Sequence, residues 1–324
     1  MPPASSILNS VPPRHTDGAA YTRGMTLRIV LMSDIHGNLP ALRAVVDALP
    51  EYDSVVVAGD LCLDGPNPAD VLDLLDELGW FLLMGNTDHD IVAQSEDLKD
   101  QKAKQVEWTR WQIGPSRLRR LASLDFSARF SPATGAVPIL GPAIDSSSAP
   151  SMPAVRSGTP PQAWVTLRVS PGERDSSAVG AAGYPLGVSR PLQPEQSQAM
   201  TDDALLVVHA NPRNLEDHLR PTMSELELRP YLAGIDANVL AFGHLHTPYI
   251  RPVDDVLLVD VASVGHPKDH DLRASYSVMS WDNERRSISQ IRVPYDVEET
   301  VHRMRHSSMP DVEKQVASLL KASY

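Results

Sequence analysis

Five short apolar runs in this 324-residue chain each end directly in residues that can bind a metal ion. The runs are rich in Val, Leu and Ile, which is typical of buried strands. Leu27–Met32 leads into Asp34 and His36, Ser54–Ala58 into Asp60, and Trp80–Met84 into Asn86. Ala204–Val208 leads into His209, and Val239–Phe242 into His244 and His246. Strands of one sheet end along a common edge, where the ligands of α/β proteins gather. The pattern therefore predicts one metal site built from distant parts of the chain.

Helical patterns separate the first three runs. The first begins at Leu39-Pro40 and ends at Pro50, and the second covers Ala69–Leu78 after Asn67-Pro68 and stops at Gly79. Strands that alternate with single helices indicate βαβ units and a largely parallel sheet. Further along, Asp97–Arg120 is predicted to be helical on both sides of a break at Gly114-Pro115.

The C-terminal part predicts a second sheet region. Val239–Phe242, Val256–Asp260, Ser275–Ser280 and Ser287–Val293 follow one another with short turns, so we expect antiparallel pairing among them. An amphipathic helix is expected over Asp311–Leu320.

Two segments differ in composition from the rest of the chain. Residues 1–24 lack an apolar core and are predicted to be a disordered extension rather than a secretory signal. Ser131–Asp203 holds eleven of the 28 prolines and few apolar residues, and only Ala163–Val169 is typical of a strand. We expect this segment to be a mostly disordered insertion in a domain of residues 25–324, with a lid over the site as the alternative.

Net charge and composition indicate which binding partners and which cellular compartment are compatible with this chain. The net charge is −12, so stable nucleic-acid binding is not expected, whereas a small phosphate ester is compatible with a local metal cluster. The single cysteine, Cys62, excludes an intramolecular disulfide and fits a reducing compartment. No stretch approaches the ~20 apolar residues needed to span a bilayer. A cytoplasmic protein is expected, and a homo-oligomer is left open.

The candidate ligands combine carboxylate, amide and imidazole groups, a set that favours Mn, Fe, Zn, Co or Ni over Ca or Mg alone. Asp34 and His36 are two residues apart, so their side chains point the same way if the strand geometry continues, and the same holds for His244 and His246. A single histidine is more often an ordinary polar residue than a ligand, so the prediction depends on the whole set. Seven ligands are too many for one ion but suit two ions that share a carboxylate.

In chain order, the motifs Asp-x-His, Gly-Asp, Gly-Asn-x-Asp, His and Gly-His-x-His resemble those of the calcineurin-like metallophosphoesterases, most closely the small bacterial and archaeal phosphodiesterase-type members. The resemblance covers roughly Leu27–Phe130 and Ala204–Leu320. Three further stretches also resemble that group: Trp108-Thr109-Arg110, Asn211-Pro212-Arg213, and Ala262–Gly265 followed by Arg273–Tyr276.

The resemblance implies an α/β fold, a four-layer αββα sandwich of two mixed β-sheets flanked by helices, and two divalent metal ions. Mn is the expected metal, with Fe, Zn, Ni or Co as alternatives. The implied ligands are Asp34, His36 and His246 for the first ion, Asn86, His209 and His244 for the second, and Asp60 between them. A hydroxide shared by the ions would be the nucleophile, with Asp60, Asn86 and His209 as catalytic residues and Asn86 against the substrate phosphate.

One position departs from the family pattern. Many relatives carry a histidine directly after the asparagine, where it can protonate the leaving oxygen, but this chain has Thr87. A hydroxyl is a poor general acid at neutral pH, so we expect phosphodiesters whose leaving groups need little protonation to be favoured. His89 is the alternative acid. Arg273 and Lys268 are candidate substrate-binding cations, and for Lys268 an ordinary solvated lysine is the alternative.

The sequence therefore predicts a dinuclear metal-dependent phosphoesterase that hydrolyses phosphodiesters of small substrates, such as cyclic nucleotides. A phosphomonoesterase, including a protein phosphatase or a dinucleoside polyphosphate hydrolase, is the alternative within enzymes. A non-catalytic scaffold of the same fold, as in the eukaryotic retromer, is the alternative outside enzymes. Such a scaffold would be expected to lose ligands, whereas all seven positions are occupied here.

Overall fold

Two six-stranded sheets pack face to face in the computed structural model, which describes residues 26–93, 98–144, 164–168, 203–282 and 285–324. The first sheet has the strand order β3-β2-β1-β11-β12-β6 and the second has the order β5-β4-β7-β8-β10-β9. The strands of the first sheet are β1 (Leu27–Met32), β2 (Ser54–Val57), β3 (Phe81–Leu82), β6 (Trp164–Arg168), β11 (Ala274–Trp281) and β12 (Arg286–Val293). Those of the second are β4 (Ser127–Phe130), β5 (Ile139–Gly141), β7 (Leu205–Val208), β8 (Val239–Phe242), β9 (Tyr249–Val253) and β10 (Val256–Asp260).

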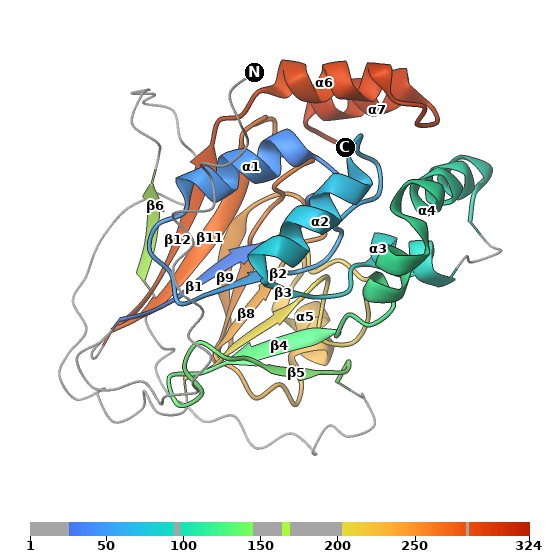
Figure 1. Ribbon diagram of the computed structural model, residues 1–324. Coiled ribbons are helices and arrows are strands. Elements are labelled where there is room, and N and C mark those ends of the chain that lie inside the picture. The colour runs from blue at the N-terminus through green and yellow to red at the C-terminus, as the bar shows by residue number, and fades with distance from the viewer. Residues whose placement is uncertain (1–25, 94–97, 145–163, 169–202, 283–284) are drawn as a thin grey trace.

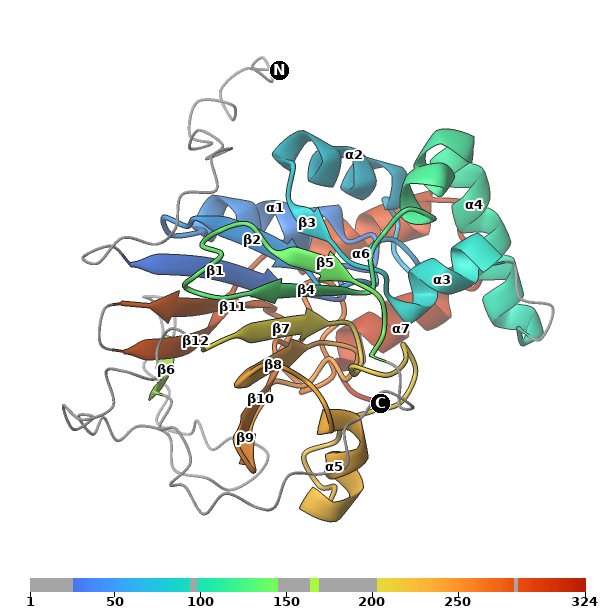
Figure 2. The same cartoon turned by 90° about the horizontal axis from the view of Figure 1, so that it is seen from below.

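Helices cover the outer faces of both sheets (Figures 1 and 2). They are α1 (Leu39–Ala48), α2 (Pro68–Leu78), α3 (Asn86–Ala93), α4 (Asp100–Leu121), α5 (Glu225–Leu232), α6 (Val297–His306) and α7 (Val312–Lys321). Helices α1 and α2 lie on the first sheet, α5 lies on the second, and α6 packs against α1 and α7 (Figures 1 and 2). Among the described residues, none of these helices combines the length and apolarity that a membrane span requires.

Strand β1 shows why the sandwich has four layers, because both of its faces are buried. Ile29 and Leu31 belong to the apolar cluster between the two sheets, together with Phe130 and residues of β8. Val30 and Met32 point the other way and join the cluster under α1 and α2. A third cluster packs the outer face of the second sheet against α5. The predicted αββα sandwich of two mixed sheets is therefore confirmed.

Local signals set the helix ends. The predicted start of α2 at Asn67-Pro68 is confirmed, although the Asn67 side chain makes no capping hydrogen bond. The Asn38 side chain accepts a hydrogen bond from the backbone N–H of Ala41 (3.2 Å) at the start of α1. Helix α2 ends at Gly79, which adopts a left-handed conformation (φ 64°) that glycine tolerates without strain. Helix α4 is interrupted at Gly114, whose φ of 69° and ψ of 175° are not helical. The predicted break at Gly114-Pro115 is thus confirmed.

The pairing predicted for the C-terminal strands is partly wrong. Strands β11 and β12 form an antiparallel hairpin, but they belong to the first sheet, where β11 also pairs with β1. Strands β8 and β10 pair in parallel in the second sheet. The reason is β9, which the sequence analysis missed: it makes the antiparallel hairpin with β10 and so lets β10 return beside β8 in the same direction.

Part of the Pro-rich segment is ordered. Strand β6 confirms the strand expected within Ala163–Val169, and it pairs in parallel with β12 at the edge of the first sheet. Strand β5 pairs with β4 and was not predicted. The extension expected at residues 1–24 and most of the predicted insertion, residues 145–163 and 169–202, lie outside the described residues.

Candidate metal centre

The seven predicted ligands follow strands of both sheets. Asp34 and His36 come after β1, Asp60 after β2 and Asn86 at the start of α3, while His209 follows β7, and His244 and His246 follow β8. Six of them are buried, and His244 is half-buried. The strand ends of the first sheet thus meet the strand ends of the second. The last ligand that follows a strand of the first sheet, Asn86, and the first that follows a strand of the second, His209, are more than a hundred residues apart in sequence.

Left-handed backbone conformations turn these side chains toward one another. Five of the seven residues have a positive φ: Asp34 (56°), His36 (48°), Asp60 (55°), His244 (67°) and His246 (56°). Strand geometry does not continue through Asp34 and His36, because β1 ends at Met32, so the condition under which their side chains would point the same way is not met. Such conformations are uncommon outside glycine and cluster at functional sites, where the surrounding structure holds them in place.

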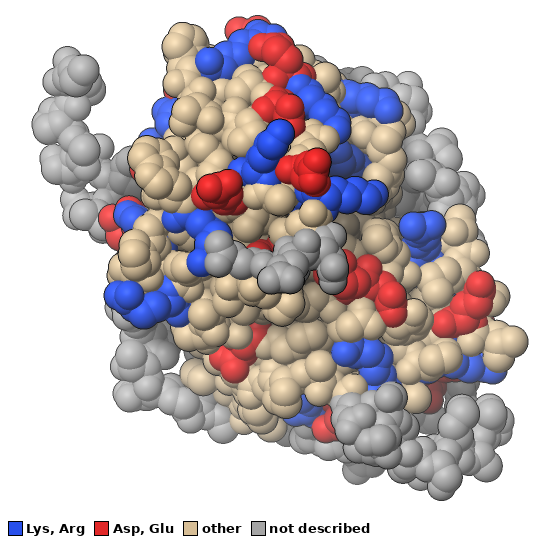
Figure 3. Space-filling view, turned by 90° about the vertical axis from the view of Figure 1, so that its right-hand side faces the viewer, with Lys and Arg blue, Asp and Glu red and all other residues tan. Residues whose placement is uncertain are grey.

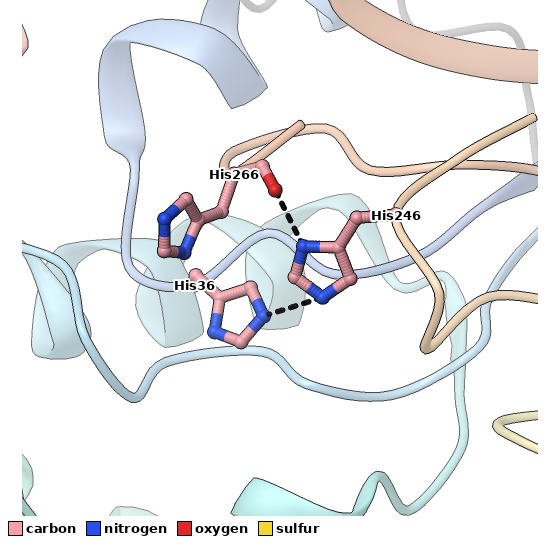
Figure 4. Close-up of side chains that lie close together, drawn as sticks. All are labelled: His36, His246 and His266. Atoms are coloured by element: carbon pink, nitrogen blue, oxygen red, sulfur yellow. Dashed lines mark hydrogen bonds between the residues drawn. The ribbon is translucent and has the colours of Figure 1, made fainter. Parts of the chain in front are cut away.

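Four of these residues form a compact cluster of candidate ligand atoms. One ligand atom from each of Asp34, His36, Asp60 and His246 lies within 4.8 Å of all the others. Nε2 of His246 lies 3.1 Å from Oδ1 of Asp34, and Nε2 of His36 lies 3.6 Å from Oδ2 of Asp60. The two Nε2 atoms are 3.3 Å apart and face each other (Figure 4).

The hydrogen bonds of the two imidazoles show what this cluster lacks. Nδ1 of His36 donates to the carbonyl of Leu63 (3.1 Å), and Nδ1 of His246 donates to the carbonyl of His266. A carbonyl oxygen can only accept, so Nδ1 carries the proton in both rings and a neutral ring has a lone pair on Nε2. Two lone pairs and two carboxylates therefore converge on one point. A cation at that point would satisfy all four groups.

Asp34 supports this interpretation. Its side chain is fully buried, and its Oδ1 accepts no hydrogen bond. Burial raises the pKa of Asp34, but the neighbouring imidazoles of His246, His209 and His36 outweigh it, so that the pKa lies well below its ordinary value. A buried, ionised carboxylate oxygen without a hydrogen-bond donor is a ligand that fits a metal ion.

The same arrangement recurs around His209. Nδ1 of His209 donates to the carbonyl of Ala58 (2.8 Å). Its Nε2 then faces Oδ1 of Asn86 at 2.9 Å and Oδ1 of Asp60 at 3.4 Å. These three atoms are again acceptors that point toward a common position.

His244 lies next to this second group. Its ring centroid is 5.0 Å from that of His209. Its Nε2 donates to the carbonyl of Glu216 (3.0 Å), which leaves Nδ1 as the atom with a lone pair. Burial and the nearby His209 lower the pKa of His244 to about 4, so the ring is neutral and able to bind a metal ion at neutral pH. The ring of His218, which the sequence analysis did not single out, lies 4.3 Å from that of His244.

Two glycines allow the loops to come this close. A Cβ added at Gly243 would lie 2.3 Å from Oδ2 of Asp34, and one added at Gly85 would lie 2.2 Å from Oδ1 of Asp60. Both distances are far below van der Waals contact. No side chain fits at Gly243 or Gly85, so only glycine is sterically compatible with these two positions.

Asp88 is a supporting residue to which the sequence analysis gave no role. One of its carboxylate oxygens accepts from the backbone N–H of Leu61 (3.0 Å) and the other from that of Gly85 (3.1 Å). It thereby ties the loop after β2 to the loop after β3. Burial, with the charge of Asp60, raises the pKa of Asp88 to about 7. The last position of the motif Gly-Asn-x-Asp was the available signal.

Thr87 lies at the second group, where many relatives carry histidine. Its backbone N–H donates to Oδ1 of Asp60 (3.0 Å), and its buried Oγ1 has no hydrogen-bond partner. His89, the alternative acid, lies within α3 and is exposed, whereas Asn86 and Thr87 are buried.

The two candidate substrate-binding cations differ in their surroundings. Arg273 makes a bidentate pair with Asp271, with its Nη2 2.7 Å from Oδ2. The Lys268 ammonium lies 3.0 Å from Nε2 of His266, whose ring centroid is 5.6 Å from that of His36. Figure 3 shows the side of the molecule that carries α3, α4 and α7, where acidic and basic side chains are interspersed. Anion binding on this side must therefore come from individual groups.

Convergent carboxylates and imidazoles at the strand ends of a two-sheet α/β sandwich are typical of a metal-dependent hydrolase. A family model described as calcineurin-like phosphoesterase matches residues 27–248, which is more than half of the chain. The chain belongs to the calcineurin-like phosphoesterase family, whose members are metal-dependent hydrolases.

Proteins from several other organisms are similar to this chain over most of its length. It is 21% identical over 302 residues to the uncharacterized protein MJ0912 of Methanocaldococcus jannaschii, covering 87% of this chain and 94% of that protein. A metallophosphoesterase from Sphaerobacter thermophilus is similar with a TM-score of 0.58 and 21% identity, covering 91% of this chain and 99% of the other. The hypothetical protein PH1004 from Pyrococcus horikoshii gives a TM-score of 0.62 and 13% identity, covering 92% and 99%. These solved structures share the fold.

Proposed function

We propose that this protein is a dinuclear metal-dependent phosphoesterase that hydrolyses phosphodiester bonds of small substrates. The observation that carries the proposal is the position of Asp60. Its Oδ2 lies 3.6 Å from Nε2 of His36, in the first group of ligand atoms, and its Oδ1 lies 3.4 Å from Nε2 of His209, in the second. One carboxylate between two groups of lone pairs is the arrangement expected of a ligand shared by two ions.

The proposed ligands are Asp34, His36 and His246 for one ion, Asn86, His209 and His244 for the other, and Asp60 for both. Two bound divalent ions would supply a water nucleophile at neutral pH and neutralise charge that develops on the phosphoryl oxygens. Imidazole and carboxylate ligands together fit Mn, and Fe, Zn, Ni or Co are alternatives.

The protein's own contribution is positioning. The carbonyls of Leu63, Ala58 and His266 fix the tautomers and orientations of three histidines, as second partners of ligand histidines do in metal sites. Asn86 is proposed to hold the substrate phosphate as well as an ion, because its amide nitrogen remains available when Oδ1 is a ligand. Arg273 is a proposed substrate contact that would have to act together with its partner Asp271.

The preference for diesters rests on Thr87. A buried hydroxyl without a partner can offer no proton at neutral pH, so good leaving groups are favoured. A phosphomonoesterase is the second candidate, since the ligand set alone does not distinguish the two. The complete ligand set argues against a scaffold. We also propose a cytoplasmic location, because the single cysteine, Cys62, is a buried free thiol.

The test is hydrolysis of bis-p-nitrophenyl phosphate and p-nitrophenyl phosphate by protein loaded with Mn²⁺. We expect the diester to have the higher kcat/KM, and Asp60→Asn and His209→Ala to lose at least about a hundredfold in kcat, because each removes a ligand. Asp236→Asn is the matched control, since the Asp236 side chain is 91% exposed. Near-wild-type rates in Asp60→Asn and His209→Ala would show that these residues are not catalytic, and a higher kcat/KM for the monoester would favour the second candidate.

A further inference from the structure

The half-buried Lys268 beside the metal centre is held by an imidazole and a hydroxyl. Two other half-buried cations, Lys102 and Arg292, instead form ion pairs with Asp90 and Asp269. Within the described residues, no carboxylate lies within 4.0 Å of the half-buried ammonium of Lys268. The carboxylate that acts most strongly on it, Asp64, lies beyond that distance.

The neighbours of Lys268 hold it in place without neutralising it. Its ammonium donates to Nε2 of His266 (3.0 Å) and to Oγ of Ser318 on α7 (3.0 Å). An ammonium can only donate, so Nε2 of His266 accepts this hydrogen bond. An ammonium has three N–H donors, and these contacts use two. The third donor is available to an anion.

The distance from the metal centre determines which anion Lys268 can reach. The backbone N–H of Lys268 donates to the carbonyl of His246 (3.0 Å), which anchors the residue to a candidate ligand. The ring of His266, which contacts the ammonium, has its centroid 5.6 Å from that of His36 and 5.8 Å from that of His246 (Figure 4). The Lys268 ammonium thus adjoins the cluster through the His266 imidazole. We therefore expect it to contact a neighbouring group of a substrate rather than the reacting phosphate.

We propose that Lys268, held by His266 and Ser318, binds a second phosphate of the substrate, so that the preferred phosphodiesters carry a phosphate group beyond the reacting one. This inference rests on the proposed function for its substrate, but the binding of the second phosphate is measurable without turnover. It also separates the two candidate cations: Lys268 lacks a carboxylate partner within the described residues, whereas Arg273 is paired with Asp271.

The test uses a matched pair of substrates, the p-nitrophenyl ester of thymidine 5′-phosphate with and without a 3′-phosphate. The wild type is expected to favour the 3′-phosphorylated ester in kcat/KM. Lys268→Met, which keeps most of the apolar stem, should lower that preference about tenfold to a hundredfold, the range for a hydrogen bond to a charged group. Lys268→Arg should restore most of it, and Lys104→Met, at an exposed lysine of α4, should leave it unchanged.

Calorimetry supplies the second measurement. The affinity ratio of thymidine 3′,5′-bisphosphate to thymidine 5′-phosphate should fall in Lys268→Met by the same factor. The inference is overturned if the wild type shows no preference for the second phosphate, or if Lys268→Met weakens both ligands of a pair equally. If the wild type hydrolyses neither ester, the proposed function fails, while the calorimetric ratio still decides the role of Lys268.

Discussion

At the scale of single residues, the centre is built from acceptor atoms that have no donor. Oδ1 of Asp34 is buried without a hydrogen bond, and Nε2 of His36 faces Nε2 of His246. Such an arrangement is costly in a metal-free protein, because each buried lone pair has lost its water. Metal binding should therefore contribute directly to stability.

The first prediction comes from this cost. Adding Mn²⁺ at a hundred times its Kd should stabilise the wild type by about 2.7 kcal/mol and raise Tm, because the ion binds only the folded state. Asp34→Asn should lose most of this increase, since an amide cannot replace the ionised oxygen, whereas Asp236→Asn should keep it. Thermal unfolding with and without Mn²⁺ measures the effect. Equal increases in Asp34→Asn and in the wild type would show that Asp34 is not a ligand.

Thr87 gives the second residue-scale prediction. Thr87→His should raise kcat for an alkyl phosphodiester several-fold more than for an aryl one, because only the alkyl leaving group needs a proton. Thr87→Val, which has nearly the same shape, serves as control and should change both rates by less than about threefold, since Oγ1 has no partner to lose. The comparison is made on kcat with saturating Mn²⁺. A gain for the alkyl ester no larger than that for the aryl ester would contradict the argument about the acid.

At the scale of elements, the centre depends on how closely the loops after the strands approach each other. Gly243 follows β8 of the second sheet and lies against Ser33 and Asp34, which follow β1 of the first. The backbone N–H of His244 donates to Oδ2 of Asp34 (2.9 Å) across the same contact. The two sheets are thus joined at the site by atoms that leave no room for a side chain.

Gly243→Ala should therefore disrupt the centre. The added methyl group would lie 2.2 Å from Oγ of Ser33 and 2.3 Å from Oδ2 of Asp34, so the loop must move. We expect a loss of about 1–3 kcal/mol in the free energy of unfolding and a weaker Mn²⁺ affinity. Gly141→Ala on β5 is the matched control, because its methyl group would meet only Oγ of Ser127, at 3.4 Å. Chemical unfolding and calorimetry check both values, and equal effects of the two substitutions would refute the steric argument.

At the scale of the whole molecule, a second contact joins the sheets at the opposite end of β7 from His209. Asp203, just before β7 of the second sheet, pairs with Arg286 of β12 and accepts from Nε1 of Trp281 on β11 (3.3 Å). Both charged side chains are largely buried. Burial raises the pKa of Asp203 even though Arg286 and Trp281 lower it, so the pair does not fully recover the cost of its own desolvation.

Replacing only Asp203 should destabilise the protein more than replacing both Asp203 and Arg286. Asp203→Asn leaves the Arg286 side chain, which is 7% exposed, without its counter-charge, and is expected to lower the free energy of unfolding by about 3–5 kcal/mol. The double variant Asp203→Leu/Arg286→Met should lie closer to the wild type, because it removes both buried charges. Urea unfolding of the single and double variants gives the comparison. A double variant less stable than Asp203→Asn would show that the pair itself stabilises the junction.

Much of the fold and of the site could be predicted from the sequence because each signal is local. The apolar runs, Gly79 at the end of α2 and the Gly114-Pro115 break depend on neighbouring residues, and the structure agrees with all of them. The antiparallel pairing expected between β8 and β10 was wrong, because their pairing depends on β9, a half-exposed strand with a weak pattern. The sequence analysis gave no role to Asp88 or His218, because Asp88 contacts Leu61 and His218 contacts His244, and each partner is more than twenty residues away in sequence.

The sequence by itself determined the class of fold and the seven candidate ligand positions, because strand ends share one edge and the motifs place a potential ligand directly after each strand. Only the tertiary structure decided how those positions meet. It showed that left-handed turns rather than continued strands aim Asp34 and His36, that Asp60 lies between two groups of lone pairs, and that Lys268 has no carboxylate partner among the described residues. These facts depend on the packing of one sheet against the other, and contacts between segments so far apart leave no periodic trace in the chain.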